Sequence, residues 1–143
     1  MAIPTQLDVR GPRFGAAVTT LVLAVAFITQ GSSLATVLVA WQLLAFGIGA
    51  IVGPHAQPYG LFFAKVIKPR LAAATEFEPS APPRFAQAVG LGFAIAALVG
   101  IATGITVLTT IAVGAALAAA FLNAAFSFCL GCEMYLLIKR MSS

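Results

Sequence analysis

Charged side chains are scarce in this sequence. Only 8% of its 143 residues are charged, whereas 61% are hydrophobic, and the mean hydropathy is +1.03. A chain of this composition cannot give a soluble domain a polar surface. The composition therefore excludes a soluble enzyme or binding module and predicts an integral membrane protein.

The signatures of several reactions are also missing. The sequence has no glycine-rich phosphate loop leading into a basic residue, no nucleophile elbow, and no paired carboxylates inside its apolar tracts. Nucleotide-driven, hydrolytic and proton-coupled functions are therefore disfavoured. The two cysteines are too few for a disulfide-rich scaffold. We predict no cofactor and, because four suitable ligands are lacking, no closed tetrahedral metal centre.

Long apolar stretches with at most one charged residue, by contrast, make up most of the chain. A membrane-spanning helix needs ~20 mostly apolar residues. Four tracts reach or approach that length, at residues 14–33, 34–53, 85–104 and 107–137. We therefore predict an all-α membrane protein with four transmembrane helices, forming a single membrane domain over residues 1–143.

A short motif occurs twice. The sequence Pro-Arg-Phe at residues 12–14 recurs at residues 83–85, a displacement of 71 positions (83 − 12). The second copy lies inside the chain and cannot belong to a signal peptide, which favours a retained first helix over a cleaved one. Together with a weaker match between the second and fourth tracts, the motif predicts two parallel helix-pair repeats, over residues 8–70 and 79–141.

The basic residues predict the orientation. All of them fall on one side of a four-helix arrangement: Arg10, Arg13, Lys65, Lys68, Arg70, Arg84, Lys139 and Arg140. Because they flank apolar tracts, we interpret them as topology signals beside membrane lipid and expect no nucleic-acid partner. The positive-inside bias predicts a protein of the inner (plasma) membrane with both termini in the cytoplasm.

The segment between the second and third tracts is the longest predicted region outside the bilayer. Residues 59–68 combine aromatic and apolar side chains with two lysines, a pattern that favours a short interfacial helix over an irregular loop. Within the bilayer, Gly-x-x-x-Gly spacings at residues 49–53 and 100–104 allow close helix packing. We expect Gln42 and Asn123 to find polar partners across helix contacts.

The only cysteines form a Cys-x-x-Cys pair, Cys129 and Cys132. We expect this pair and Glu133 on one face of the fourth helix, near its cytoplasmic end. Three interpretations stay open: packing of two small apolar side chains, a thiol site that carries a disulfide or a persulfide, and a metal site with His55. The helix C-terminus and Glu133 would both disfavour a thiolate, although Gly131 could interrupt the helix and reorient local amides.

If the cysteine pair is a thiol site, basic residues elsewhere in the fold would have to stabilise its thiolate. Arg13 and Arg84 occupy equivalent repeat positions on the predicted cytoplasmic side, where they either flank a shared vestibule or anchor their helices to lipid headgroups. His55, Glu133 and Tyr135 are the other candidate residues of this vestibule.

Several motifs together resemble a known family. They lie at residues 10–14, 58–60, 68–71, 78–79, 82–87 and 128–135, and in this order the chain resembles the bacterial membrane family called domain of unknown function 4395. The resemblance implies that Cys129 and Cys132 are the working residues, beside a soluble thioredoxin-like or rhodanese-like partner. It does not supply a substrate.

Three functions follow as hypotheses. The first is a thiol/disulfide or persulfide relay through Cys129 and Cys132. The second is a small transporter or channel for a sulfur-containing or other anionic solute, with Arg13 and Arg84 attracting the anion. The third is a non-catalytic membrane anchor or complex subunit that recruits its partner through residues 65–70. Whether the chain forms a homo-oligomer is left open.

Overall fold

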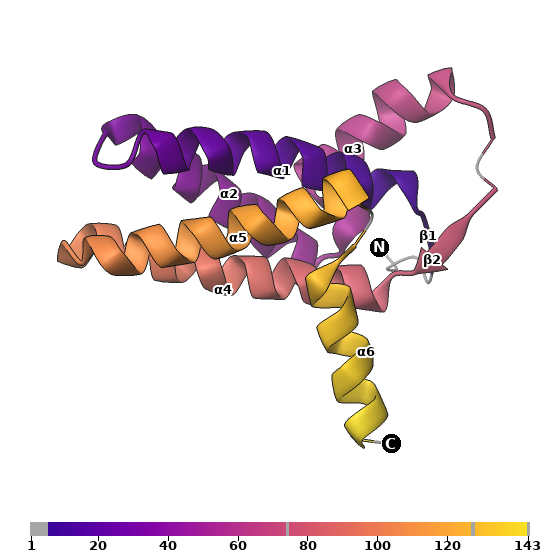
Figure 1. The fold of residues 1–143 in the computed structure, drawn as a ribbon. Coiled ribbons are helices and arrows are strands. Elements are labelled where there is room, and N and C mark those ends of the chain that lie inside the picture. Colours follow the sequence, from indigo (N-terminus) through magenta and orange to yellow (C-terminus); the bar gives the residue numbers. More distant parts are fainter. Residues whose placement is uncertain (1–5, 74, 127, 143) are drawn as a thin grey trace.

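Four long helices run side by side and form the body of the protein (Figure 1). The computed structural model describes residues 6–73, 75–126 and 128–142. The long helices are α1 (Arg10–Ile28), α2 (Ser33–Ile51), α4 (Ala81–Thr103) and α5 (Thr106–Phe126). Each is long and apolar enough to cross a membrane, which confirms the prediction of a multi-pass membrane protein.

Tight turns join the helices into two antiparallel hairpins, α1 with α2 and α4 with α5 (Figure 1). Gly31 and Gly104 adopt positive φ angles of 89° and 75° in these turns, a conformation that glycine adopts without steric cost. Ser32 then caps α2 by accepting a 3.2 Å hydrogen bond from the Ala35 amide. The hairpins pack so that α2 contacts α4 and α1 contacts α5.

The core is made of small side chains. Its central cluster consists of Leu23, Ala26, Val39, Ala97, Ala112, Val113 and Ala116. Small residues allow close helix approach in a bilayer, where packing replaces the hydrophobic effect as the driving force. At Gly100 an added Cβ would lie 2.8 Å from the Thr109 main-chain nitrogen, so the backbones of α4 and α5 come into contact there.

Gln42 is completely buried and has the polar partners that we predicted. Its Oε1 accepts a 2.8 Å hydrogen bond from the Tyr59 hydroxyl, and its Nε2 donates to Thr19 at 3.4 Å. Trp41 donates its indole N–H to the same hydroxyl at 2.8 Å. This network ties α2 to α1 and to the short helix α3 (Pro58–Phe62).

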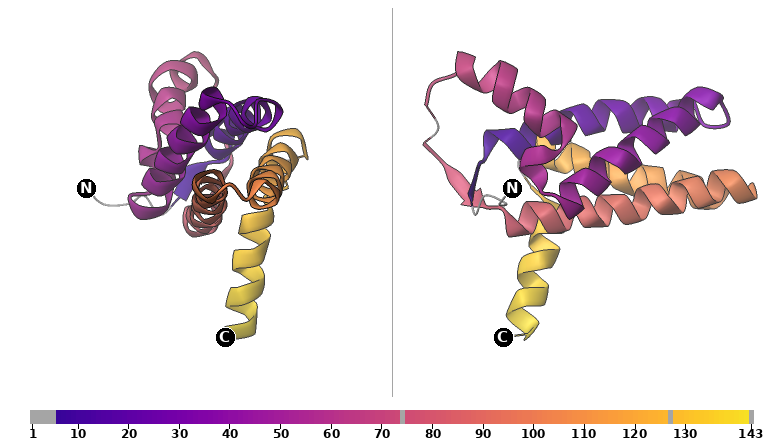
Figure 2. Two further views of the ribbon diagram at one scale, coloured as in Figure 1. Left: turned by 90° about the vertical axis from the view of Figure 1, so that its left-hand side faces the viewer. Right: turned by 180° about the vertical axis from the view of Figure 1, so that it is seen from behind.

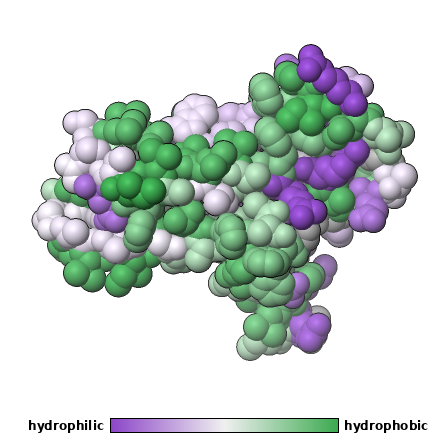
Figure 3. All heavy atoms as spheres, turned by 45° about the horizontal axis from the view of Figure 1, so that its top comes forward, coloured by the Kyte–Doolittle hydropathy of each residue, from purple (hydrophilic) through white to green (hydrophobic). Residues whose placement is uncertain are grey.

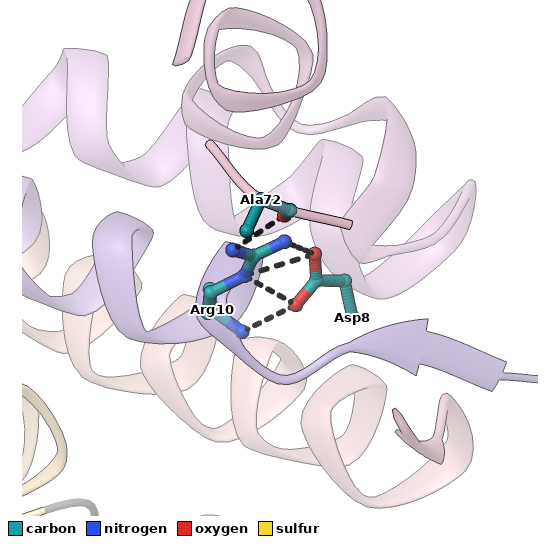
Figure 4. A network of polar contacts seen from close by, with 3 residues as sticks. All are labelled: Asp8, Arg10 and Ala72. Carbon is teal, nitrogen blue, oxygen red and sulfur yellow. Dashed lines mark hydrogen bonds and ion pairs between the residues drawn. The ribbon is translucent and has the colours of Figure 1, made fainter. Parts of the chain in front are cut away.

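Polar and charged groups gather at one end of the bundle, the end from which the chain enters α1 and α4 (Figure 3). A two-stranded antiparallel sheet that the sequence did not predict lies there, formed by β1 (Gln6–Asp8) and β2 (Phe77–Pro79). Asp8 accepts hydrogen bonds from the Arg10 main chain and side chain, and Arg10 reaches the Ala72 carbonyl (Figure 4). These contacts connect the N-terminal strand, α1 and the central segment.

The central segment continues from α3 through a π-helical turn, η2 (Phe63–Ile67), into the 3-10 turn η3 (Lys68–Arg70). Another 3-10 turn, η1 (Pro54–Ala56), precedes α3. The predicted helix over residues 59–68 is therefore a succession of short helical pieces.

The fourth apolar tract is two helices, and the prediction of one helix over residues 107–137 was wrong. Helix α5 ends at Phe126, and α6 (Leu130–Ser142) leaves the bundle at a steep angle (Figures 1 and 2). The Phe128 amide turns back to donate to the Leu122 carbonyl, which closes the end of α5. Hydropathy does not mark this break because the residues around it are apolar.

Candidate functional site

The two cysteines lie at the beginning of α6. Cys129 directly precedes the helix and Cys132 is in its first turn. Their Cα atoms are 5.1 Å apart and their sulfur atoms are bonded as a disulfide. The expected position near the C-terminal end of a helix is thus wrong, because the chain breaks between α5 and α6.

This position reverses the electrostatic argument against a thiolate. The Cys132 amide donates to the Cys129 sulfur at 3.1 Å, and the Glu133 amide donates to the Cys129 carbonyl at 3.0 Å. Amides at a helix N-terminus carry partial positive charge and lower the pKa of a nearby thiol. In the reduced protein, Cys129 is therefore the sulfur that this helix end favours as a thiolate.

Helix α6 is fixed against α4 at its first turn. A Cβ added to Gly131 would lie 2.6 Å from the Ala86 Cα atom, so only glycine allows this approach. One turn further on, the Tyr135 ring packs on Phe85 with centroids 5.8 Å apart. Glycine within the Cys-x-x-Cys motif thus positions the disulfide relative to the bundle.

The disulfide lines a cavity of about 580 Å³. The cavity lies between α1, α4 and α5 at the charged end of the bundle, and residues as deep as Thr19, Phe46 and Phe93 line it. Its walls include several alanines of α5, and its polar lining includes Arg13, Gln87 and Asn123.

The two arginines of the repeated motif each donate hydrogen bonds to main-chain carbonyls at the end of a helix, but the two helices differ. The Arg13 Nε donates to the Ala124 carbonyl near the end of α5 at 3.2 Å. Arg84 donates to the carbonyls of Ala50 and Ile51 at the end of α2, at 2.7 and 2.9 Å. Each arginine binds the C-terminal end of a neighbouring helix, where a positive charge is favourable. Of the two, only Arg13 lines the cavity with the cysteines.

The other predicted site residues lie outside the cavity lining. Glu133 is exposed in the first turn of α6, and Tyr135 packs on Phe85 as described. Both ring nitrogens of His55 in η1 are buried and have no hydrogen-bond partner among the described residues. No group of three or more His, Cys, Asp or Glu side chains in the described part of the chain could hold a metal ion.

Two amides contribute to the cavity in ways that the sequence did not indicate. We expected Asn123 to pair across a helix contact, but its side chain lines the cavity and makes no hydrogen bond within residues 6–73, 75–126 and 128–142. Gln87 was not singled out, although an amide one turn inside an apolar tract was a usable signal. Its Oε1 accepts a short hydrogen bond from Gln57.

Comparison with known families gives one result. A family model described as "Domain of unknown function (DUF4395)" matches residues 7–140. Comparisons with curated proteins and with solved structures give no match.

Proposed function

Since the chain belongs to the family described as domain of unknown function DUF4395, a description that assigns no activity, we propose a function from the site itself: thiol–disulfide exchange at a membrane surface. In this proposal Cys129 and Cys132 exchange two electrons with a soluble partner that carries a reactive thiol pair. The observation that carries the proposal is the Cys-x-x-Cys motif at the N-terminus of α6, facing a cavity that Arg13 also lines.

The exchange follows ordinary disulfide chemistry. A partner thiolate attacks the Cys129 sulfur, the bond to Cys132 breaks, and Cys132 leaves as a thiol or thiolate. The second partner thiol then attacks the mixed disulfide, which releases Cys129 and leaves the partner oxidised. The amide of Cys132, 3.1 Å from the Cys129 sulfur, assists this second step because it stabilises the departing Cys129 thiolate.

The same site suits a soluble thioredoxin-like partner, or a rhodanese-like partner if the cargo is a persulfide sulfur. We place the site on the cytoplasmic face of the inner membrane, because the basic side chains lie at the cysteine end of the bundle. In that compartment the resting state of the pair is the dithiol, and the partner cycles it.

We also infer that the bundle is a pair of helix-hairpin repeats with interfacial segments at its charged end. The matching roles of Arg13 and Arg84 at neighbouring helix ends support the repeat, as does the packing of Phe14 on Phe62 and of Phe85 on Tyr135. Helix α6 carries exposed apolar side chains, including Leu137 and Met141, and ends with basic residues. Such a helix suits the plane of a membrane surface.

Trapping experiments on the full-length protein in detergent test the exchange. The reduced variant Cys132→Ser should form a mixed disulfide with an oxidised thioredoxin-like protein, whereas Cys129→Ser should form little. Iodoacetamide at pH 7 should alkylate Cys129 at least about 10-fold faster than Cys132, because the amides at the N-terminus of α6 favour the Cys129 thiolate. Inertness of both cysteines toward thiols and oxidants would refute the proposal and leave their packing role.

Transport of a sulfur-containing or other anionic solute is a second candidate, and one observation favours it. A second cavity of about 440 Å³ lies at the opposite end of the bundle, beside Gly31 and Gly104. Members of the apolar core cluster line both cavities, Ala116 the first and Ala26, Val39 and Val113 the second. Uptake of labelled sulfate or thiosulfate into proteoliposomes tests transport, and a flux that Arg13→Ala does not alter would argue against a role of Arg13 in it.

A further inference from the structure

We propose that the cavity beside the disulfide binds a lipid-soluble quinone, which accepts the two electrons of the Cys129–Cys132 dithiol. This inference rests on the proposed thiol exchange and names the second reactant of the same site. Three observations carry it: the dimensions of the cavity, its position in the bundle, and the polar groups that line it.

The cavity has the size and walls of a small-molecule site. Its volume of about 580 Å³ falls in the range of about 300–1,000 Å³ that is usual for such sites. Alanines of α5, including Ala116 and Ala119, form much of its wall, and the rings of Phe46 and Phe93 line its inner part. Small aliphatic walls with aromatic faces suit a flat apolar ring.

The cavity also reaches into the apolar part of the bundle. Thr19 lies nine residues inside α1 from Arg10, which at 1.5 Å per residue corresponds to about 14 Å along the helix. The disulfide lies at the charged end of the same cavity. A ligand that partitions into the bilayer can therefore occupy the deep part while its reactive end lies near the sulfur atoms.

Polar groups of the lining select a ligand with hydrogen-bond acceptors. Asn123 makes no side-chain hydrogen bond within the described ranges, and Gln87 uses only its oxygen, with Gln57 as the donor. Arg13 uses its Nε for the Ala124 carbonyl, which leaves its terminal nitrogens to donate. Polar groups in an apolar cavity need partners. The carbonyl oxygens of a quinone accept such bonds, whereas an acyl chain does not.

The redox step balances without a further reactant. The Cys129 and Cys132 thiols lose two electrons and two protons and form the S–S bond. The quinone takes up both electrons and both protons on its two oxygens and becomes a quinol. Positive charge on Arg13 stabilises the negative charge that develops on the nearer oxygen during transfer. The soluble dithiol partner then reduces the disulfide again.

Anaerobic turnover in nanodiscs tests the inference on the full-length protein. Decylubiquinone is added to the dithiol-reduced, desalted protein, and quinol formation is followed by absorbance while free thiols are counted by alkylation. Quinone binding is measured separately by quenching of Trp41 fluorescence. We expect one quinol per disulfide formed. The variant Ala119→Leu, which fills the cavity, should weaken binding and slow quinol formation at least 10-fold.

Ala118→Leu is the matched control, because Ala118 is the exposed neighbour of Ala119 and does not line the cavity. Both variants should exchange with the soluble thioredoxin-like protein as the unsubstituted protein does. Intact thiol exchange without quinone binding, or equal effects of the two substitutions, would overturn the quinone inference and leave the proposed function in place. Quinone binding without oxidation of the thiols would overturn it as well. Absence of thiol exchange between the unsubstituted protein and the thioredoxin-like protein would instead refute the proposed function.

Discussion

The hydroxyl of Tyr59 links two polar side chains of α2. Its hydroxyl donates to the fully buried Gln42 and accepts from Trp41, each at 2.8 Å. Burial raises the pKa of Tyr59, so the hydroxyl remains a donor at neutral pH. Tyr59→Phe should lower the free energy of unfolding by about 1–3 kcal/mol, because it leaves buried polar groups unpaired.

Trp41 is the only tryptophan, so its fluorescence reports both the unfolding transition in denaturing detergent and the loss of its hydrogen bond. Tyr135→Phe is the control, since the Tyr135 ring packs on Phe85 and its hydroxyl has no hydrogen bond within the described residues. Equal stability of the two variants would contradict the role assigned to the Tyr59 hydroxyl.

The contribution of Asp8 to the stability of the folded protein depends on pH. Hydrogen bonds from Arg10 hold the pKa of Asp8 below its ordinary value of 3.8. Since the folded pKa is the lower one, the ionised group stabilises the folded protein above pH 3.8, and this stabilisation is lost as the pH falls through the folded pKa. Asp8→Asn should therefore destabilise the protein at pH 7, by about 1 kcal/mol for a partly exposed pair.

The difference between Asp8→Asn and the unsubstituted protein should shrink in thermal unfolding experiments as the pH falls below 3.8. Glu76→Gln is the comparison, because the Glu76 carboxylate forms no ion pair in the described part of the chain. A stability difference for Asp8→Asn that stays constant with pH would show that its charge is not involved.

The identity of single residues in the sequence predicted some of their structural roles but not others. The cost of burying an amide was enough to predict a polar partner for Gln42, but the same argument did not distinguish a helix contact from a cavity wall for Asn123. The environment of Cys129 depends on where α6 begins, and no single residue type near the break signals that position. The role of Gly131 was visible as a possible interruption, but its close approach to Ala86 is a property of the packed helices.

At the scale of helices and strands, hydropathy predicted each long helix to within about four residues at its start, because a spanning helix must satisfy its backbone hydrogen bonds internally. It failed where the apolar pattern continues through a change of direction, as between α5 and α6. It also missed β1 and β2, since two strands of three residues carry no periodic signal. They pair residues that are distant in the sequence, such as Asp8 with Phe77, and local pattern does not reveal such a contact.

The four glycines of the two Gly-x-x-x-Gly spacings do not all lie at helix contacts. Gly49 and Gly100 lie at close helix contacts, whereas Gly53 and Gly104 adopt positive φ angles at helix ends. Gly100→Ala should lower the free energy of unfolding by about 1–3 kcal/mol, because its Cβ would meet the main chain and hydroxyl of Thr109.

Gly92→Ala is the matched substitution in the same helix, since an added Cβ at Gly92 meets no atom within 4 Å. It should be neutral or stabilising by up to about 1 kcal/mol through helix propensity. Detergent unfolding followed by Trp41 fluorescence measures both variants. If Gly100→Ala unfolds like Gly92→Ala, α4 and α5 are not in backbone contact at Gly100.

For the whole molecule, the distribution of charge determines how the bundle lies in a membrane. The described basic side chains belong to the end that carries α6 and the strands, and the turns at Gly31 and Gly104 carry none. An arginine or lysine at the bilayer centre costs about 2.5–3.5 kcal/mol on insertion scales, so we predict that this end stays on the cytoplasmic side, where the chain is synthesised.

Labelling single cysteines in a Cys129→Ser/Cys132→Ser background tests this orientation. Ser33 is exposed at the start of α2, and Met141 is 78% exposed near the end of α6. A membrane-impermeant maleimide added to intact spheroplasts should label Ser33→Cys but not Met141→Cys, and inverted vesicles should give the opposite result. Labelling of both positions from one side would mean that the hairpins do not cross the bilayer, while the reverse pattern would place the thiol site outside the cytoplasm, where a thioredoxin-like reductant of that compartment cannot reach it.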